Sequence, residues 1–357
     1  MNEAREPDLI VGKDDCILVT GATGFIGTRL VRALLDRGFG NLRCFARPSA
    51  GLARIESEWR QHANGKWLEV VEGNLLSMED CVAATKGANV IFHLAAGRGE
   101  KSIPDAYMNS VVATRNLLES SRQHHCLRRF VNISSFTVYT NQNNSHGRLL
   151  DESCPVDRRP ELRGEAYTFA KVKQDEIVAE YSARFGIPYV IIRPGVVYGP
   201  GNEAITGRVG IGTFGLFLHL GGANTIPFTY VDNCAEAILL SGLKRGVDGE
   251  VFNVVDDDLP SARKFLHLYK KNVRRFKSVY IPHFLSYTLC YLWERYVNWS
   301  EGQLPPAFNR SRWHANWKKT RYSNCKLKTR LSWTQAVPTR EGLNRYFESC
   351  RAKVSHA

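Results

Sequence analysis

Short apolar runs alternate with amphipathic stretches along the first half of the chain. The apolar runs are rich in β-branched residues, which is typical of buried strands, and the stretches between them repeat apolar positions at helical spacing. This alternation predicts an α/β fold, a doubly wound parallel sheet. The expected strands are Cys16–Val19, Leu42–Ala46, Leu68–Val71, Val90–Leu94, Arg129–Ile133 and Tyr189–Ile192, and the expected helices include Phe25–Arg37, Tyr107–His124 and Ala166–Phe185.

After Arg193 the alternation loosens into segments rich in glycine and aromatic residues. We therefore predict a parallel α/β domain over residues 14–193, with one further strand near 251–255. Residues 194–357 are expected to form mainly a smaller, basic and aromatic-rich substrate-binding lobe. With 357 residues, 43% of them hydrophobic, the chain can bury a full core in this arrangement.

The composition argues against several classes of protein. Residues 1–13 are polar and lack the basic start and apolar run of a secretory signal, so a cytoplasmic location is expected. The most apolar late window, Phe284–Trp293, is too short to span a bilayer. Nine cysteines without CxxC pairs or finger-like spacing predict neither a metal site nor a disulfide framework.

The charge is concentrated in the C-terminal part. Between Ser261 and Arg330, 16 Lys and Arg stand against two acids, Glu294 and Glu301, so this segment accounts for the net charge of +13. A solvated basic face and contact with anionic lipid or an anionic substrate both explain this excess. Nucleic acid is not expected as a partner because no recognition module is visible.

Three glycines directly follow the first expected strand, and the next helix opens at about Phe25. In such a turn the first glycine permits the tight bend, the second lets the backbone approach a pyrophosphate, and the third lets helix and strand pack closely. The helix N-terminus then presents free N–H groups to the phosphates. Residues 14–193 are therefore predicted to form a Rossmann NAD(P)-binding domain. The residues expected to bind a nicotinamide dinucleotide here are Gly21, Thr23, Gly24, Phe25, Ile26 and Gly27.

The end of the second strand indicates which dinucleotide is bound. An acidic residue there would accept hydrogen bonds from the ribose hydroxyls of NAD, whereas an arginine suits the 2′-phosphate of NADP. This strand ends in Ala46 and Arg47, with no acid. NADP is therefore favoured over NAD, with Arg47 as its phosphate contact.

Tyr167 and Lys171 are four residues apart and share one face of an expected helix. A phenol, with a pKa of about 10, is a poor base at neutral pH, but a nearby ammonium favours the phenolate. Ser134 and Ser135 end the preceding strand and would present hydroxyls at the same edge of the sheet. The three side chains Ser135, Tyr167 and Lys171 therefore form a candidate catalytic group.

Seven motifs, in order along the chain, resemble those of the extended short-chain dehydrogenase/reductases, a group that also holds nucleotide-sugar epimerases and 3β-hydroxysteroid dehydrogenases. They are TGATGFIG at Thr20–Gly27, HLAA at His93–Ala96, NSVVATRNLLE at Asn109–Glu119, NISSFTVY at Asn132–Tyr139, YTFAK at Tyr167–Lys171, RPGVVYGPG at Arg193–Gly201 and FTYVDN at Phe228–Asn233.

The resemblance implies hydride transfer between the nicotinamide and a carbinol carbon of a small-molecule substrate. It makes Tyr167 the acid/base, Lys171 its partner and ribose contact, and Ser135 the residue that orients the reacting oxygen. Asn74 stands where the family usually has an aspartate beside adenine. The resemblance also allows a homodimer. Further cofactor contacts that it implies are Asn74, Leu75, Ala95, Ala96, Asn109, Pro194, Val196 and Val197.

Departures from the family pattern narrow the reaction. The acidic pair of 4,6-dehydratases is replaced by Phe136 and Thr137, so dehydration is not expected. Two usual anchors of nucleotide sugars, an asparagine and an arginine, are replaced by Val196 and Ile226. The first hypothesis is thus an alcohol/ketone oxidoreductase acting on a bulky, steroid-like or sugar-like substrate. The alternatives are a nucleotide-sugar epimerase and a non-catalytic NADP-binding regulator, and the intact Ser135, Tyr167 and Lys171 oppose the regulator.

The segment Val279–Trp299 combines many aromatic residues with few charges and is followed by Pro305–Phe308. It resembles the hydroxysteroid dehydrogenase and sterol-decarboxylase branch, where such a stretch forms a hydrophobic lid or touches membrane. An ordinary core helix is favoured here over peripheral membrane contact, and both stay open. Together with residues 207–222, this segment is expected to line the substrate pocket.

Overall fold

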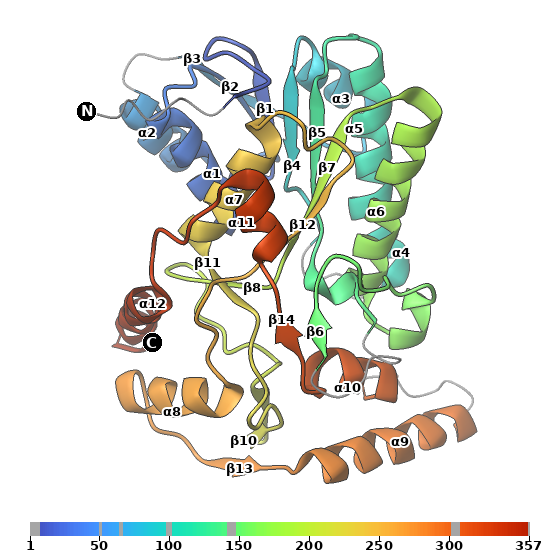
Figure 1. Ribbon diagram of the computed structural model, residues 1–357, viewed down its shortest axis with the longest axis vertical. Coiled ribbons are helices and arrows are strands. Elements are labelled where there is room, and N and C mark those ends of the chain that lie inside the picture. The colour runs from blue at the N-terminus through green and yellow to red at the C-terminus, as the bar shows by residue number, and fades with distance from the viewer. Residues whose placement is uncertain are drawn as a thin grey trace.

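A seven-stranded parallel sheet forms the centre of the molecule, in the order β12-β7-β5-β4-β1-β2-β3 (Figure 1). The computed structural model describes residues 8–49, 52–63, 67–97, 102–140, 148–300 and 308–355. All six expected strands are present, so the predicted doubly wound sheet is confirmed. The sheet strands are β1 (Ile17–Thr20), β2 (Asn41–Ala46), β3 (Trp67–Glu72), β4 (Val90–His93), β5 (Arg129–Ile133), β7 (Tyr189–Pro194) and β12 (Val251–Val254).

Helices cover both faces of this sheet (Figure 1). Each helix turns an apolar stripe inward: Leu30 and Leu34 of α1 are fully buried on one face, and Leu117 and Leu118 of α5 on the other. One face carries α1 (Phe25–Asp36), α2 (Leu52–Ala63), α7 (Val231–Leu243) and α11 (Cys325–Leu331), and the other carries α3 (Met78–Thr85), α5 (Ala113–Arg122) and α6 (Ala166–Phe185).

The helix expected over residues 107–124 contains an irregular turn. It begins as α4 (Ile103–Ala106), continues through a π-helical turn at Tyr107–Val112, and becomes α5 without a break. Ala106, Val112 and Ala113 all keep right-handed helical dihedral angles, so the axis is not interrupted. A π-turn accommodates one extra residue and occurs frequently at functional sites.

A smaller lobe lies below the sheet in Figure 1 and is built around an aromatic core. Tyr198, Phe228, Phe265 and Tyr346 are buried together there. Its strands are β6 (Leu149–Leu150), β8 (Val196–Tyr198), β9 (Gly210–Thr213), β10 (Leu216–His219), β11 (Phe228–Tyr230), β13 (Ser278–Tyr280) and β14 (Arg321–Tyr322). Its helices are α8 (Ala262–Asn272), α9 (His283–Trp299), α10 (Arg310–Trp317) and α12 (Thr339–Ser355), and short 3₁₀ turns, η2 and η3, span Phe136–Val138 and Pro160–Arg163.

Strand β12 and helices α7 and α11, all from beyond residue 193, belong to the main layers. Strand β12 lies at the place expected for a strand near 251–255 and pairs in parallel with β7, and α7 and α11 pack into the core shared with α1. The division of the chain at residue 193 stays a prediction.

Helix α9 is not the core helix that its composition favours. Only Ser286, Cys290 and Val297 are buried, while Phe284 and Trp299 are 75% and 78% exposed. Glu301 and residues 305–307 lie outside the described residues. None of the helices in the described ranges is both long and apolar enough to cross a membrane.

Candidate active site

The glycine turn after β1 is packed so closely that side chains do not fit. Gly21 has a φ of +68°, and a Cβ there would lie 2.7 Å from the backbone nitrogen of Ala95. A Cβ on Gly27 would overlap the carbonyl oxygens of Gly21 and Ala22. The turn is closed by a hydrogen bond from Gly24 N–H to Gly21 O at 2.9 Å. Glycine is therefore required at positions 21 and 27 by the approach of helix, turn and strand.

Helix α1 begins directly after this turn with Gly24 as its N-cap. Glycine has no side chain to cap the first N–H groups, and no side-chain cap is present. Uncapped N–H groups together with the helix dipole favour an anion at this end. The turn therefore offers a cradle that fits a dinucleotide pyrophosphate.

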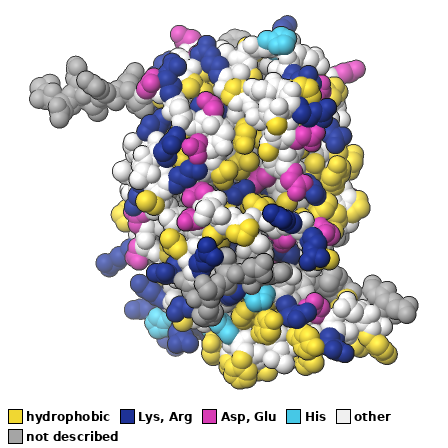
Figure 2. Space-filling view, turned by 45° about the vertical axis from the view of Figure 1, so that its right-hand side comes forward, with side chains coloured by type: hydrophobic (Ala, Val, Ile, Leu, Met, Phe, Trp, Pro, Cys, Tyr) yellow, Lys and Arg dark blue, Asp and Glu magenta, His cyan; other side chains and the backbone are white. Residues whose placement is uncertain are grey.

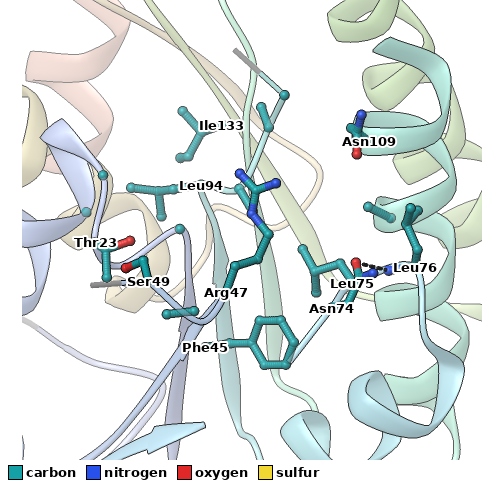
Figure 3. Close-up of a pocket in the computed structure, with 18 of the residues that line it drawn as sticks. Thr23, Phe45, Arg47, Ser49, Asn74, Leu75, Leu76, Leu94, Asn109 and Ile133 are labelled. Carbon is teal, nitrogen blue, oxygen red and sulfur yellow. Dashed lines mark hydrogen bonds between the residues drawn. The ribbon is translucent and has the colours of Figure 1, made fainter. Parts of the chain in front are cut away.

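A cavity of about 810 Å³ opens at the carboxyl ends of β1, β2 and β4 (Figure 3). It brings together most of the cofactor residues expected from the sequence: Gly21, Thr23, Gly24, Phe25, Ile26, Gly27, Arg47, Asn74, Leu75, Ala95, Ala96 and Asn109. The other lining residues went unpredicted, although most are neighbours of predicted ones: Phe45, Ala46, Pro48, Ser49, Leu76, Leu94, Gly97, Asp105, Ala113 and Ile133. Asp105 could have been found from its place one helical turn before Asn109.

Arg47 and Asn74 face the cavity from neighbouring strand ends. Arg47 extends from the end of β2 into the open space toward Leu94, and Ser49 and Thr23 lie to the left of it (Figure 3). Asn74 follows β3, and its Oδ1 accepts the N–H of Leu76 at 3.0 Å. Since that oxygen is engaged in the turn, the Nδ2 group is the more available part of the amide for a base.

The three expected catalytic residues come from two elements beside this cavity. Ser135 follows β5, Tyr167 lies in the first turn of α6, and Lys171 lies one turn later. Lys171 is 4% exposed, and its Nζ donates to the carbonyl of Ile133, a cavity-lining residue, at 2.7 Å. The same ammonium lies 5.9 Å from the ring centroid of Tyr167, which is 40% exposed. An ammonium at the cavity wall and an accessible phenol are thus held side by side.

The remaining predicted residues lie outside the cavity lining. Pro194 ends β7, and Val196 and Val197 are on β8, where they pair with Phe228 and Thr229 of β11. Ser135, Tyr167 and Lys171 are likewise adjacent to the lining rather than part of it.

A buried polar chain beneath the cavity was not predicted. His93 is 1% exposed, with Nδ1 2.8 Å from Thr20 Oγ1 and Nε2 2.9 Å from Thr114 Oγ1. Gln174 extends the chain by donating to Thr114 Oγ1 at 2.8 Å. Burial lowers the pKa of His93 to about 3, so the imidazole is neutral at pH 7. The chain joins the ends of β1 and β4 to α5 and α6.

Asp175 is a second residue that the sequence analysis missed. It receives hydrogen bonds from Asn132 Nδ2 and Ser134 Oγ, each at 2.9 Å, and from Arg193 at 3.0 Å. Burial raises the pKa of this carboxyl, and the Arg193 guanidinium opposes that shift. Its spacing of four residues from Lys171 places it on the same face of α6 and was the available signal. These contacts fix α6 against β5 and β7.

Comparison with known proteins assigns the family. The profile of the NAD dependent epimerase/dehydratase family matches residues 17–254. The chain belongs to this family. The extended short-chain dehydrogenase/reductase resemblance drawn from the motifs is thereby confirmed. In the described ranges, no group of three or more His, Cys, Asp or Glu could hold a metal ion.

Two relatives are similar to the chain over different lengths. It is 34% identical over 198 residues to a 3 beta-hydroxysteroid dehydrogenase/Delta 5-->4-isomerase of Mycobacterium tuberculosis, covering 53% of this chain and 49% of the relative. It is 24% identical to the Arabidopsis thaliana 3beta-hydroxysteroid-dehydrogenase/decarboxylase isoform 1, covering 93% and 79% of the two chains. The chain thus spans about half the length of the mycobacterial relative.

One similar solved structure is the UDP-glucuronic acid 4-epimerase of Bacillus cereus in complex with NAD. It has a TM-score of 0.68 and 21% sequence identity, covering 95% of this chain and 99% of the epimerase. At that identity the likeness establishes the fold alone.

Proposed function

We propose that this family member is an NADP-dependent oxidoreductase that interconverts a secondary alcohol and a ketone, with Tyr167 as acid/base. The observation that carries the proposal is the position of Lys171. Its ammonium bonds to Ile133 O at 2.7 Å, at the wall of the cavity, and lies beside the exposed phenol of Tyr167. A phenol paired with an ammonium next to a dinucleotide cradle is suited to moving the hydroxyl proton of a substrate.

Each side chain then has one task. When bound, the nicotinamide dinucleotide exchanges a hydride with the substrate carbon. Tyr167 takes the hydroxyl proton during oxidation and returns it during reduction, and Lys171 favours the phenolate form through its positive charge. Ser135 orients the reacting oxygen through its hydroxyl, whose Oγ is itself fixed by the Thr137 N–H at 3.2 Å.

The arginine at the end of β2 supports NADP rather than NAD. Arg47 extends into the cavity, and Ser49 and Thr23 line the same cavity to the left of it (Figure 3). A cavity with a guanidinium and two hydroxyls in its lining suits a phosphate, because charge-assisted hydrogen bonds to an anion are stronger than neutral ones. The relative affinities for NADP⁺ and NAD⁺ test this preference.

The proposed substrate is bulky and largely apolar. Ile226, which stands where nucleotide-sugar enzymes usually have an arginine, is buried in the aromatic core of the lobe and offers no group to a pyrophosphate. The two relatives described above are named for 3β-hydroxysteroid activity. A steroid-like secondary alcohol fits both observations.

A nucleotide-sugar epimerase is the second candidate. The basic C-terminal segment favours it, because Lys and Arg there could replace the missing pyrophosphate anchors. Such an enzyme would show no net consumption of the dinucleotide. The intact Ser135, Tyr167 and Lys171 oppose a non-catalytic regulator.

We further infer that α9 meets an anionic membrane surface as a peripheral contact. Its exposed residues include Phe284, Leu289, Leu292 and Trp299. Figure 2 shows hydrophobic side chains gathered at the lower edge of the molecule, with Lys and Arg beside them. Apolar side chains flanked by basic ones suit a helix that lies in the interface plane. Flotation with anionic vesicles measures this contact.

One experiment tests the reaction. Purified protein is mixed with NADP⁺ or NADPH and offered hydroxysteroids and ketosteroids, or UDP- and GDP-sugars, while absorbance of the reduced nicotinamide is followed. We expect net turnover with the steroids and a Tyr167→Phe variant that is roughly 10²- to 10⁴-fold slower. Sugar interconversion without net dinucleotide change would instead establish the epimerase, and full activity of Tyr167→Phe would remove the proposed base.

A further inference from the structure

A buried arginine connects the turn after Ser135 to the first turn of the Tyr167 helix. Arg163 ends η3, and its side chain is 2% exposed. One guanidinium nitrogen, Nη1, donates to the backbone carbonyl of Thr137. The other, Nη2, donates to Glu165 Oε2 at 2.9 Å. A planar guanidinium can make both bonds at once in fixed directions, which a lysine cannot do.

Each of these bonds ends next to a proposed catalytic group. Thr137, whose carbonyl Arg163 binds, donates its N–H to Ser135 Oγ at 3.2 Å. Glu165 is the N-cap of α6, two residues before Tyr167, and its Oε2 also accepts from Thr168 Oγ1 at 3.2 Å. The Arg163 guanidinium therefore holds both Thr137, the residue whose N–H bonds to Ser135, and Glu165, the residue that begins the Tyr167 helix.

The same cluster is held from the C-terminal lobe. Asn309, the N-cap of α10, donates its Nδ2 to the backbone carbonyl of Arg163 at 3.0 Å, and its Oδ1 accepts the Arg312 N–H at 2.8 Å. Arg312 Nε bonds to the second oxygen of Glu165 at 3.0 Å. Glu165 is thus bridged between Arg163 and Arg312.

Helix α10 is in turn attached to α9. Arg310 pairs with Glu294 at 2.9 Å, and Trp313 Nε1 donates to Ser286 Oγ at 2.9 Å. Leu220, Cys290, Trp313 and Trp317 form a small apolar core between these elements. The exposed helix α9 is therefore connected by a continuous series of contacts to the turns that carry Ser135 and Tyr167.

We propose that Arg163 is a positioning residue for the reaction, holding the Ser135 turn and the Tyr167 helix in register, and that Arg312 and Asn309 of α10 hold it in place. This inference rests on the proposed roles of Ser135 and Tyr167. In this proposal α10 stabilises the geometry of the active site without contacting the reacting atoms.

Four variants of the full-length chain test the proposal with NADP⁺ bound. Arg163→Lys keeps the charge but replaces two donating nitrogens in a fixed fork by one, and Arg312→Gln removes the α10 ion pair at a side chain that is 37% exposed. Arg184→Gln is the matched control, since Arg184 forms an i,i+4 surface pair with Glu180 farther along α6. Tyr167→Phe reports whether the proposed reaction itself is correct.

Two readouts are taken on each variant: the split between kcat and KM for turnover of hydroxysteroids, and amide hydrogen exchange of residues 136–139 and 165–169. We expect Arg163→Lys to lower kcat by about 100-fold and Arg312→Gln by a smaller factor, with KM for NADP⁺ unchanged. Exchange in both segments should rise by about tenfold, because the turns open more often. Arg184→Gln should match the parent in both readouts.

The two proposals fail in different ways. Absence of turnover in the parent, or an active Tyr167→Phe variant, overturns the reaction, and the exchange readout still decides the positioning role. The positioning role is wrong if amide hydrogen exchange is unchanged in both Arg163→Lys and Arg312→Gln. It is also wrong if both variants keep the parental kcat while Tyr167→Phe is inactive.

Discussion

Backbone contacts shape the cofactor cavity, whereas side-chain contacts hold the α9–α10 pair together. At the cavity, the backbone of a glycine turn approaches the segment after β4 and the start of α1 so closely that positions 21 and 27 admit only glycine. In the α9–α10 pair, a few side chains such as Trp313 and Cys290 form a small core, and most apolar residues of α9 face outward. Glycines that a close backbone approach requires can be recognised in a sequence, whereas the exposure of an apolar helix cannot.

The largest effect is expected where the backbone contact is closest. Gly27→Ala introduces a Cβ that overlaps two carbonyl oxygens, so the turn must open. We expect the affinity for NADP⁺ to fall by at least about 100-fold and the free energy of unfolding to drop by about 1–3 kcal/mol. Fluorescence titration and urea unfolding measure the two quantities.

Gly212→Ala, in β9 of the lobe, is the matched control because its Cβ would meet nothing within 4 Å. It should leave both quantities at the parental values. Parental NADP⁺ binding by Gly27→Ala would show that the turn is not part of the cofactor site.

The next effect concerns the choice of dinucleotide. Arg47→Ala should weaken NADP⁺ binding by about 10- to 100-fold and leave NAD⁺ binding nearly unchanged, because only NADP⁺ carries the 2′-phosphate. Arg60→Ala on α2, which removes an exposed i,i+4 pair with Glu56, is the control. Equal losses for both dinucleotides on titration would contradict the assignment of Arg47.

One buried histidine, His93, and one partly buried histidine, His314, allow a comparison of acid sensitivity between the regions. Burial lowers the pKa of His93 to about 3 and that of His314 in α10 to about 4. In the unfolded chain both bind protons below about pH 6.5, so the free energy of unfolding falls as the pH drops below that value. Each site contributes a slope of at most about 1.4 kcal/mol per pH unit, down to its folded pKa.

Removing either titration should flatten the pH dependence. His93→Gln, which can still bond to Thr20 and Thr114, should reduce the slope between pH 6.5 and 3, and His314→Gln should reduce it less, since His314 is only partly buried. Urea unfolding at a series of pH values gives the slopes. If the His93→Gln slope equals that of the parent, the imidazole is not held neutral in the fold.

The smallest effect on folding is expected on α9. Leu289 and Leu292 are 52% and 54% exposed, so replacing both by alanine should change the free energy of unfolding by less than about 0.5 kcal/mol. The fully buried Leu34→Ala, in contrast, should cost about 2–5 kcal/mol. Binding of the α9 variant to anionic vesicles should nevertheless fall by about tenfold, since apolar area at the interface is lost. Undiminished vesicle binding would exclude α9 as the contact.

The segments that the sequence predicts best are those whose residues allow few alternative structures. The strand Arg129–Ile133 and the helix Ala166–Phe185 match the structure residue for residue, because their periodicity and their flanking serines and Gly186 admit one interpretation. Twelve expected cofactor residues line one cavity for the same reason. Motifs tied to a backbone shape are placed correctly by their order along the chain.

The residues that were missed depend on contacts between distant segments. His93 lies in a strand and a motif that were expected, but its partner Gln174, joined to it through Thr114, follows no local pattern that distinguishes it from exposed polar residues. The outward face of α9 was missed because dense aromatic residues serve a core and a surface equally well. The link from Arg163 to α10 spans 146 residues and follows no periodicity.

The π-helical turn at Tyr107–Val112 makes the wall of the cavity sensitive to chain length as well as to side-chain identity. Each residue of an α-helix rotates the side-chain direction by about 100°. The extra residue of the π-turn therefore sets the direction of the side chains on its N-terminal side. Deleting one residue there would convert the turn to ordinary α-helix while α5 stays anchored through Thr114 to His93 and Gln174. Asp105 and Asn109 would then rotate away from the cavity that they now line. One extra residue in a regular helix is therefore enough to turn these two side chains toward the cavity.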